Sequence, residues 1–133
     1  MRTSRYFATV LTLLTTTAFS SQAADMDGAW ASDATVCSNV FVKRNNTVTF
    51  TPDSELYGGG LIIEGNRVTG SFQKCNIKSL KRDGDTVHLV ASCSTGVMVS
   101  DLQIMIKRVG YNQITLSPAG PLDTASSYVR CSL

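Results

Sequence analysis

The sequence predicts an all-β fold: a single small antiparallel β-barrel of about eight strands, stapled by two disulfides. Short runs that alternate apolar and polar residues are separated by turn residues along most of the chain, and no segment has convincing helical periodicity. Four cysteines are spaced by 38, 18 and 38 residues. A barrel is favoured because closure removes exposed strand edges, and a two-sheet β-sandwich is the alternative.

The first 23 residues have the pattern of a secretory signal peptide. Two arginines precede an apolar stretch, Tyr6–Leu14, which is too short to span a bilayer, since a spanning helix needs about 20 apolar residues. Ser21–Ala23 fits a cleavage site with small residues on either side of a variable one. We therefore expect residues 1–23 to be removed and residues 24–133 to form one β domain. An N-terminal helix of the folded domain is the alternative.

The expected mature chain is balanced in charge, with ten basic and ten acidic side chains. This balance argues against a globally basic surface that would bind nucleic acid. An even number of cysteines in an exported protein indicates paired cysteines, so we expect a periplasmic or secreted protein.

The strands follow one another as consecutive hairpins. In chain order the expected strands are Gly28–Ser32, Val36–Val42, Thr47–Thr51, Leu61–Glu64, Arg67–Phe72, Cys75–Lys81, Thr86–Cys93, Val97–Val109, Gln113–Leu116 and Ser127–Cys131. A bulge near Ser100 and Asp101 is expected in the longest of them, because its apolar residues switch faces there.

Turn chemistry sets the register of the first hairpins. Asn45 and Asn46 tolerate positive φ and suit a two-residue turn, which places Phe41 opposite Phe50. The same reasoning at Gly65-Asn66 places Ile63 opposite Val68.

The inner pair of cysteines meets across a third hairpin. A three-residue loop, Asp83–Asp85, sets Arg82 against Thr86 and brings Cys75 opposite Cys93. Four cysteines allow three connectivities, and this register favours the one with a Cys75–Cys93 bridge. Cys37–Cys131 then follows by elimination and would join an early strand to the last one.

Residues for catalysis or metal binding are sparse. His88 is the only histidine, and alternation places it on the face opposite its apolar neighbours. Four paired cysteines leave no thiolate for nucleophilic or metal chemistry. Asp53 and Glu55 could form an acid–base pair, but two acids in a polar loop are more typical of plain surface. We predict no catalytic residue, no metal and no cofactor.

A glycine-rich loop is the first candidate binding site. Gly58, Gly59 and Gly60 follow Tyr57, whose large amphipathic side chain suits contact with a partner. The alternative is a structural role, either as a long hairpin connection or as a glycine-rich bulge.

A basic cluster around one hairpin is the second candidate. Lys74, Lys78, Lys81 and Arg82 lie close in sequence, and of these Lys78, Lys81 and Arg82 are predicted to form an anionic contact site. The alternative is a solvated hairpin face, since Asp83 and a second aspartate at the tip partly offset the charge.

The first expected strand carries a Gly-x-Trp motif, Gly28-Ala29-Trp30. This motif resembles the opening of lipocalin-like and avidin-like barrels, and of the small periplasmic barrel inhibitors of proteases and lysozymes. The resemblance implies a barrel whose tryptophan plugs one end. A second lipocalin motif is absent, and Gly70–Lys74 matches only loosely the Ser-Gly-x-Lys/Arg-Tyr loop of lysozyme inhibitors. No inhibitory residue is therefore carried over.

These features favour an exported, non-catalytic module that binds a protein partner, most concretely an inhibitor of a secreted hydrolase such as a lysozyme or protease. No nucleic-acid partner and no membrane span are expected. A barrel that binds a small apolar ligand is the alternative, and an enzyme is a remote one. The ligand-binding alternative needs a cavity, so a core filled by large side chains would argue against it. The side chains that would fill such a core are Phe41, Phe50, Phe72, Leu89 and Ile104.

Overall fold

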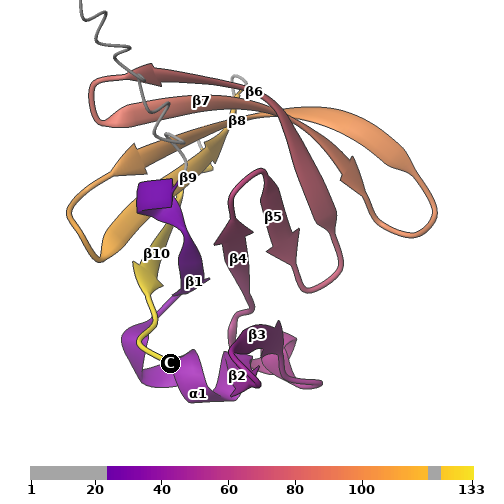
Figure 1. Cartoon of the computed structure of the whole chain (residues 1–133), viewed down its shortest axis with the longest axis vertical. Helices are drawn as coiled ribbons and strands as arrows, with labels where there is room; N and C mark the ends of the chain where they lie inside the picture. The colour runs from indigo at the N-terminus through magenta and orange to yellow at the C-terminus, as the bar shows by residue number, and fades with distance from the viewer. Residues whose placement is uncertain (1–23, 120–123) are drawn as a thin grey trace, which may run out of the picture.

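A computed structural model describes residues 24–119 and 124–133 of the chain. The predicted signal peptide, residues 1–23, lies outside the described residues. Figure 1 shows a set of long, strongly twisted strands above a small helical and hairpin layer.

Three short 3-10 helices, one helix and ten strands make up the described residues. In order they are η1 (Ala24–Met26), β1 (Gly28–Ala31), η2 (Ala34–Val36), α1 (Cys37–Val40), β2 (Phe41–Arg44), β3 (Thr47–Phe50), η3 (Ser54–Tyr57), β4 (Gly60–Glu64), β5 (Arg67–Gly70), β6 (Lys74–Asp83), β7 (Thr86–Ser94), β8 (Val99–Arg108), β9 (Gln113–Pro118) and β10 (Ser126–Arg130).

Eight of these strands close into an antiparallel barrel, in the order β1-β10-β9-β8-β7-β6-β5-β4. Closure depends on β1, which pairs with β10 on one side and with β4 on the other. The remaining two strands, β2 and β3, form a separate hairpin. The predicted eight-stranded antiparallel barrel is confirmed.

Alternation along the strands, interrupted once in β6, fills the barrel with apolar side chains, as expected for a barrel of this size. Trp30 on β1 is 1% exposed, and its indole N–H donates to the carbonyl oxygen of Met26 at 3.0 Å. The buried residues of this core are Met26, Trp30, Leu61, Ile63, Val87, Leu89, Ile106 and Ile114.

Arg130, the last residue of β10, packs over the tryptophan. The carbon at the centre of its guanidinium lies 4.3 Å from the centroid of the Trp30 ring and 5.1 Å from that of Tyr111. Its N–H groups donate to the carbonyl oxygens of Asp25, at 2.9 Å, and Asp27. One side chain therefore ties the last strand to the first strand and to the segment before it.

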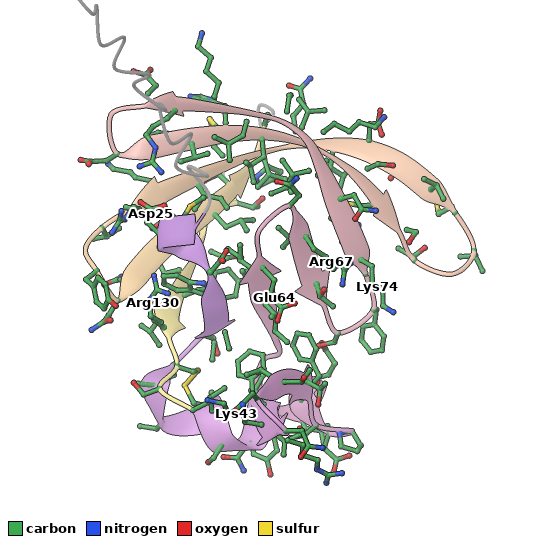
Figure 2. All side chains as sticks on the ribbon, in the orientation of Figure 1. Asp25, Lys43, Glu64, Arg67, Lys74 and Arg130 are labelled. Carbon is green, nitrogen blue, oxygen red and sulfur yellow. A yellow bond between two sulfur atoms is a disulfide. The ribbon has the colours of Figure 1, made fainter. Side chains whose placement is uncertain are left out.

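Asp25 completes the same end of the barrel. Its carboxylate forms ion pairs with Arg82 of β6 and Arg108 of β8. These contacts hold η1 across the barrel end, and Figure 2 shows Asp25 above Arg130 at that end.

A second apolar cluster lies outside the barrel. The β2–β3 hairpin and α1 pack on the outer face of β1 and β4, and Phe41 and Phe50 are paired with ring centroids 5.1 Å apart. The buried residues of this outer cluster are Ala29, Ala31, Val40, Phe41 and Ile62. The expected register, Phe41 opposite Phe50 and Ile63 opposite Val68, is confirmed.

Both predicted disulfides are present, and together they use all four cysteines. Cys37, however, opens α1, so the expectation of a strand from Val36 to Val42 and of no helix was wrong. The carboxylate of Asp33 accepts a hydrogen bond from the backbone N–H of Thr35 and starts a helical stretch. Val36 and Val40, spaced by four, then both reach the outer cluster.

The β6–β7 hairpin pairs Cys75 with Cys93, as predicted, but its register near the tip differs from the expected one. The turn contains two residues and not three, so Asp83 pairs with Thr86. The register shifts between Ile77 and Ser79, and this shift restores the pairing of Cys75 with Cys93. The predicted pairing at the tip was therefore wrong by one residue, and the irregularity at Lys78 compensates for it.

The expected bulge near Ser100 and Asp101 is also wrong. β7 and β8 pair without interruption from Thr86–Lys107 to Ser94–Val99. The strand begins only at Val99, since Val97 belongs to the preceding turn and is 92% exposed. The turn accounts for Val97, while Val99 lies within β8, opposite Ser94, with its side chain exposed.

Candidate functional site

The glycine-rich loop has a structural explanation. Gly58 and Gly59 have φ of +85° and +62°, a region that other residues rarely adopt. A Cβ on Gly60 would overlap the backbone of Trp30 and come within 2.8 Å of Cζ of Phe41. The fold therefore requires these glycines. Contact of a partner with Tyr57, which is 42% exposed at the end of η3, stays a prediction.

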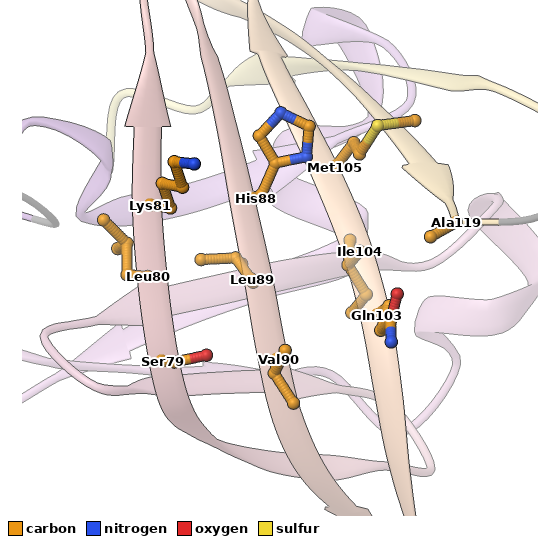
Figure 3. Close-up of a pocket in the computed structure, with 10 residues that line it drawn as sticks. All are labelled: Ser79, Leu80, Lys81, His88, Leu89, Val90, Gln103, Ile104, Met105 and Ala119. Atoms are coloured by element: carbon orange, nitrogen blue, oxygen red, sulfur yellow. The ribbon is translucent and has the colours of Figure 1, made fainter.

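The predicted basic site is divided between two faces of β6. Lys78 forms an ion pair with Asp101 of β8 at 2.9 Å. Arg82 bonds to Asp25 at the barrel end, at 3.1 Å. Lys81 lies on the outer face near His88 (Figure 3). The structure does not bring Lys78, Lys81 and Arg82 together as one patch, and binding by any of them stays a prediction.

Figure 3 shows a small pocket of about 190 Å³ across β6, β7 and β8. His88 lies here between its register partners Lys81 and Met105, and it is exposed, as the alternation predicts. Among the residues that line this pocket, Ser79 carries the only hydroxyl and none carries a carboxylate. The described residues contain no group of three or more His, Cys, Asp or Glu side chains that could hold a metal ion.

Of the five side chains that would argue against a hollow core, only two lie in the barrel. Leu89 is buried in the barrel core, and Ile104 is partly buried against it. Phe41 and Phe50 belong to the outer cluster, and Phe72 is 76% exposed in the loop after β5. Alternation assigns a face within one hairpin only, so it could not show whether these phenylalanines lie in the barrel. The barrel is filled instead by Trp30 and the aliphatic residues around it.

A wider hollow than the His88 pocket lies outside the barrel. It measures about 530 Å³ and runs between β3 and the outer face of β4, β5 and β6, and we call it the hairpin groove. Its lining residues are Val48, Thr49, Phe50, Ile62, Glu64, Arg67, Thr69, Lys74, Asn76 and Ser94.

Alternation places the polar residues of the groove. On β5, Val68 packs against the barrel core, so Arg67 and Thr69 project outward on either side of it. Two cross-strand rows form the floor: Glu64, Arg67 and Asn76 in the first, and Ile62, Thr69 and Lys74 in the second. The hairpin supplies the wall, through Val48 and Phe50.

Glu64, Arg67 and Lys74 are the charged residues of the groove. Figure 2 shows them on three neighbouring strands, β4, β5 and β6. None of the three side chains forms a hydrogen bond or ion pair within the described residues. Their charges leave one positive charge in excess, and all three heads remain available to a ligand.

Two further hollows adjoin the groove at the end of the barrel that carries the Cys75–Cys93 bridge, and we call them the barrel-end hollows. One, of about 330 Å³, lies between the loop after β5 and the end of β7. The other, of about 360 Å³, lies along the turn between β7 and β8. The strongly exposed apolar side chains here are Phe72 (76%), Val97 (92%), Met98 (63%) and Val99 (72%).

The groove was not predicted from the sequence. The turn at Gly65-Asn66 does show that Glu64 and Arg67 share a face, and this signal was available. The position of the β2–β3 hairpin over that face was not, because it depends on packing between segments distant in sequence. The sequence shows Lys74 as part of a basic cluster, but its position beside Thr69 depends on the β5–β6 register.

Two disulfides indicate an oxidising, extracellular type of environment. Within the described residues, no helix has the length and apolar character needed to cross a membrane. Comparisons with protein-family models, with curated proteins and with solved structures gave no match.

Proposed function

We propose that this protein is an exported, non-catalytic module that binds another protein, and that it inhibits a secreted hydrolase such as a lysozyme or protease. Its place of action is the periplasm or the cell exterior. The observation that carries the proposal is the hairpin groove, an open hollow of about 530 Å³ with apolar and unpaired charged groups, outside a barrel filled by its own side chains.

The character of the groove suits a protein segment. Phe50 and Val48 offer apolar contact, while Arg67 and Lys74 carry charges that form no ion pair within the described residues. An apolar centre with polar groups around it is typical of protein interfaces. The filled barrel, with Trp30 1% exposed at its end, favours this function over binding of an apolar ligand inside.

The groove also favours binding over catalysis. Glu64 is its only acid, and the groove contains no histidine or cysteine. A general base within hydrogen-bond reach of a nucleophile is the usual arrangement in hydrolases. His88 lies in the separate pocket on β6–β8 and shares no lining residue with the groove.

The rigidity of the scaffold supports an inhibitory role. The Cys37–Cys131 bridge fastens α1, beside the hairpin, to the end of β10, and the Cys75–Cys93 bridge fastens β6 to β7. A preorganised surface loses little conformational entropy on binding, which favours a tight and long-lived complex.

The test is an inhibition panel of lysozymes and secreted proteases, using the oxidised protein and two matched variants. Thr69→Tyr fills the groove floor, while Thr115→Tyr adds the same bulk on the outer face of β9. We expect inhibition of at least one enzyme, weakened about tenfold or more by Thr69→Tyr and unchanged by Thr115→Tyr. A panel without inhibition, or inhibition insensitive to Thr69→Tyr in a folded variant, would contradict the proposal.

A further inference from the structure

We propose that the hairpin groove and the barrel-end hollows form one channel that receives an extended acidic segment of the partner protein. Acidic side chains of the segment bind at Arg67 and Lys74, and apolar side chains next to them enter the hollows beside Phe72 and Val97. This inference rests on the proposed function and specifies the chemistry of the partner.

The three hollows are continuous along the surface. Lys74 and Ser94 line both the groove and the first barrel-end hollow. Ser94 and Gly96 line both barrel-end hollows. A ligand that follows this path crosses the Arg67 row first, then Lys74, and then the apolar end. An extended chain suits such a path because it presents side chains at regular intervals.

The charge of the path favours an acidic segment. Three basic residues of β6 and β8 have acidic partners: Lys78 pairs with Asp101, and Arg82 and Arg108 pair with Asp25. The basic heads at Arg67 and Lys74 form no such pair. Unneutralised cations on a binding surface favour partners of opposite charge and increase the association rate.

The negative charge of Glu64 limits where the acidic side chains of the partner segment can bind. It is the register partner of Arg67, in the first row of the groove floor. Lys74 lies in the second row, opposite Thr69 and nearer the barrel-end hollows. An acidic side chain at Lys74 therefore lies farther from the Glu64 carboxylate than one at Arg67. We infer that Lys74 is the stronger determinant of the two.

The apolar end of the path is a hollowed surface with several exposed apolar side chains. Phe72 and three consecutive apolar residues, Val97–Val99, are strongly exposed there. Exposed apolar groups gathered in one place mark an interaction site more often than isolated ones do. The surface between them is hollowed by about 330 and 360 Å³, which suits single side chains of a peptide better than a flat lipid surface.

The experiment measures binding of three end-blocked ten-residue peptides to the oxidised full domain by fluorescence anisotropy and by amide shifts in NMR spectra. The first peptide contains two glutamates followed by a valine–leucine pair. The second has glutamine and the third lysine in place of the glutamates. At about 50 mM salt we expect the glutamate peptide to bind roughly fivefold tighter than the glutamine peptide, since one exposed ion pair contributes up to about 1 kcal/mol. The difference should shrink at about 300 mM salt.

Variants locate the effect. Lys74→Gln should remove most of the preference for glutamate, and Arg67→Gln a smaller part. Lys107→Gln, on an exposed lysine of β8 outside the groove, should leave it unchanged. Phe72→Ser should weaken the binding of all three peptides. The control is Val109→Ser, at an exposed valine just after the opposite end of β8, and it should leave their binding unchanged.

Each other outcome counts against the inference in a distinguishable way. Equal binding of the glutamate and glutamine peptides, with amide shifts at Thr69, would overturn the acid preference and leave the proposed function intact. Absence of binding by every peptide would overturn the channel, while the hydrolase panel judges the proposed function separately. Phe72-dependent binding to phosphatidylcholine–phosphatidylglycerol vesicles, without peptide binding, would assign the apolar end to a membrane instead.

Discussion

Arg130→Lys tests how the closed end of the barrel is held. Lysine keeps the positive charge but lacks the planar fork of donors that binds two carbonyl oxygens while stacking on a ring. In the structure that fork reaches Asp25 and Asp27, and the guanidinium stacks on Trp30 at 4.3 Å. The substitution therefore removes one charge-assisted hydrogen bond and most of the stacking.

The magnitude follows from these contacts. A hydrogen bond to a charged group contributes about 1.5–3 kcal/mol, and a partly desolvated cation–π contact about 1 kcal/mol. We expect Arg130→Lys to lower the free energy of unfolding by about 2.5–4 kcal/mol. This loss is a large part of the roughly 5–15 kcal/mol typical of a domain.

Urea unfolding of the oxidised protein measures this loss. With a slope of about 1–3 kcal/mol per molar urea, the midpoint should fall by about 1 M or more. Arg67→Lys is the matched control, because Arg67 has no hydrogen bond or ion pair within the described residues, and a shift within about 0.5 kcal/mol is expected. A loss for Arg130→Lys no larger than for Arg67→Lys would refute the reasoning.

Two further predictions concern the backbone and a helix cap. Gly60→Ala should destabilise the fold by several kcal/mol in urea unfolding, because its Cβ overlaps the backbone of Trp30, whereas Gly110→Ala has open space and should be near neutral. The pKa of Asp33 lies below its ordinary value because the backbone N–H of Thr35, and then its hydroxyl, donate to the carboxylate. The associated stability is present above the pKa of the unfolded chain and is lost as pH falls through the lowered folded pKa. An NMR titration midpoint of Asp33 at or above that of an aspartate in an unfolded peptide would contradict this.

Local signals predicted the parts of the fold that local chemistry determines. Asn45 and Asn46 adopt φ of +50° and +62°, and the register of Phe41 with Phe50 follows from their turn. The Cys75–Cys93 bridge was predicted correctly although the tip was wrong, because the irregularity at Lys78 offsets the shorter turn. A compensating shift of this kind leaves no mark in the alternation pattern.

Features that depend on packing between segments distant in sequence could not be predicted. Val36 and Val40 alternate like strand residues, yet they form helical turns because both must reach the cluster outside β1 and β4. Phe72 has a large apolar side chain of the kind usually found in a core, yet it is exposed beside a hollow. The groove exists only because the β2–β3 hairpin packs outside the barrel, so a face assigned to one hairpin could not reveal it.

Amide hydrogen exchange of this protein in complex with its target hydrolase tests the central claim, that the partner binds outside the barrel and in the hairpin groove. The free protein and its complex with a hydrolase that it inhibits would be compared amide by amide. We predict slower exchange in β3, β4, β5 and the first half of β6, with no change in β9 and β10. Protection confined to β9, β10 and the Arg130 end of the barrel would contradict the claim.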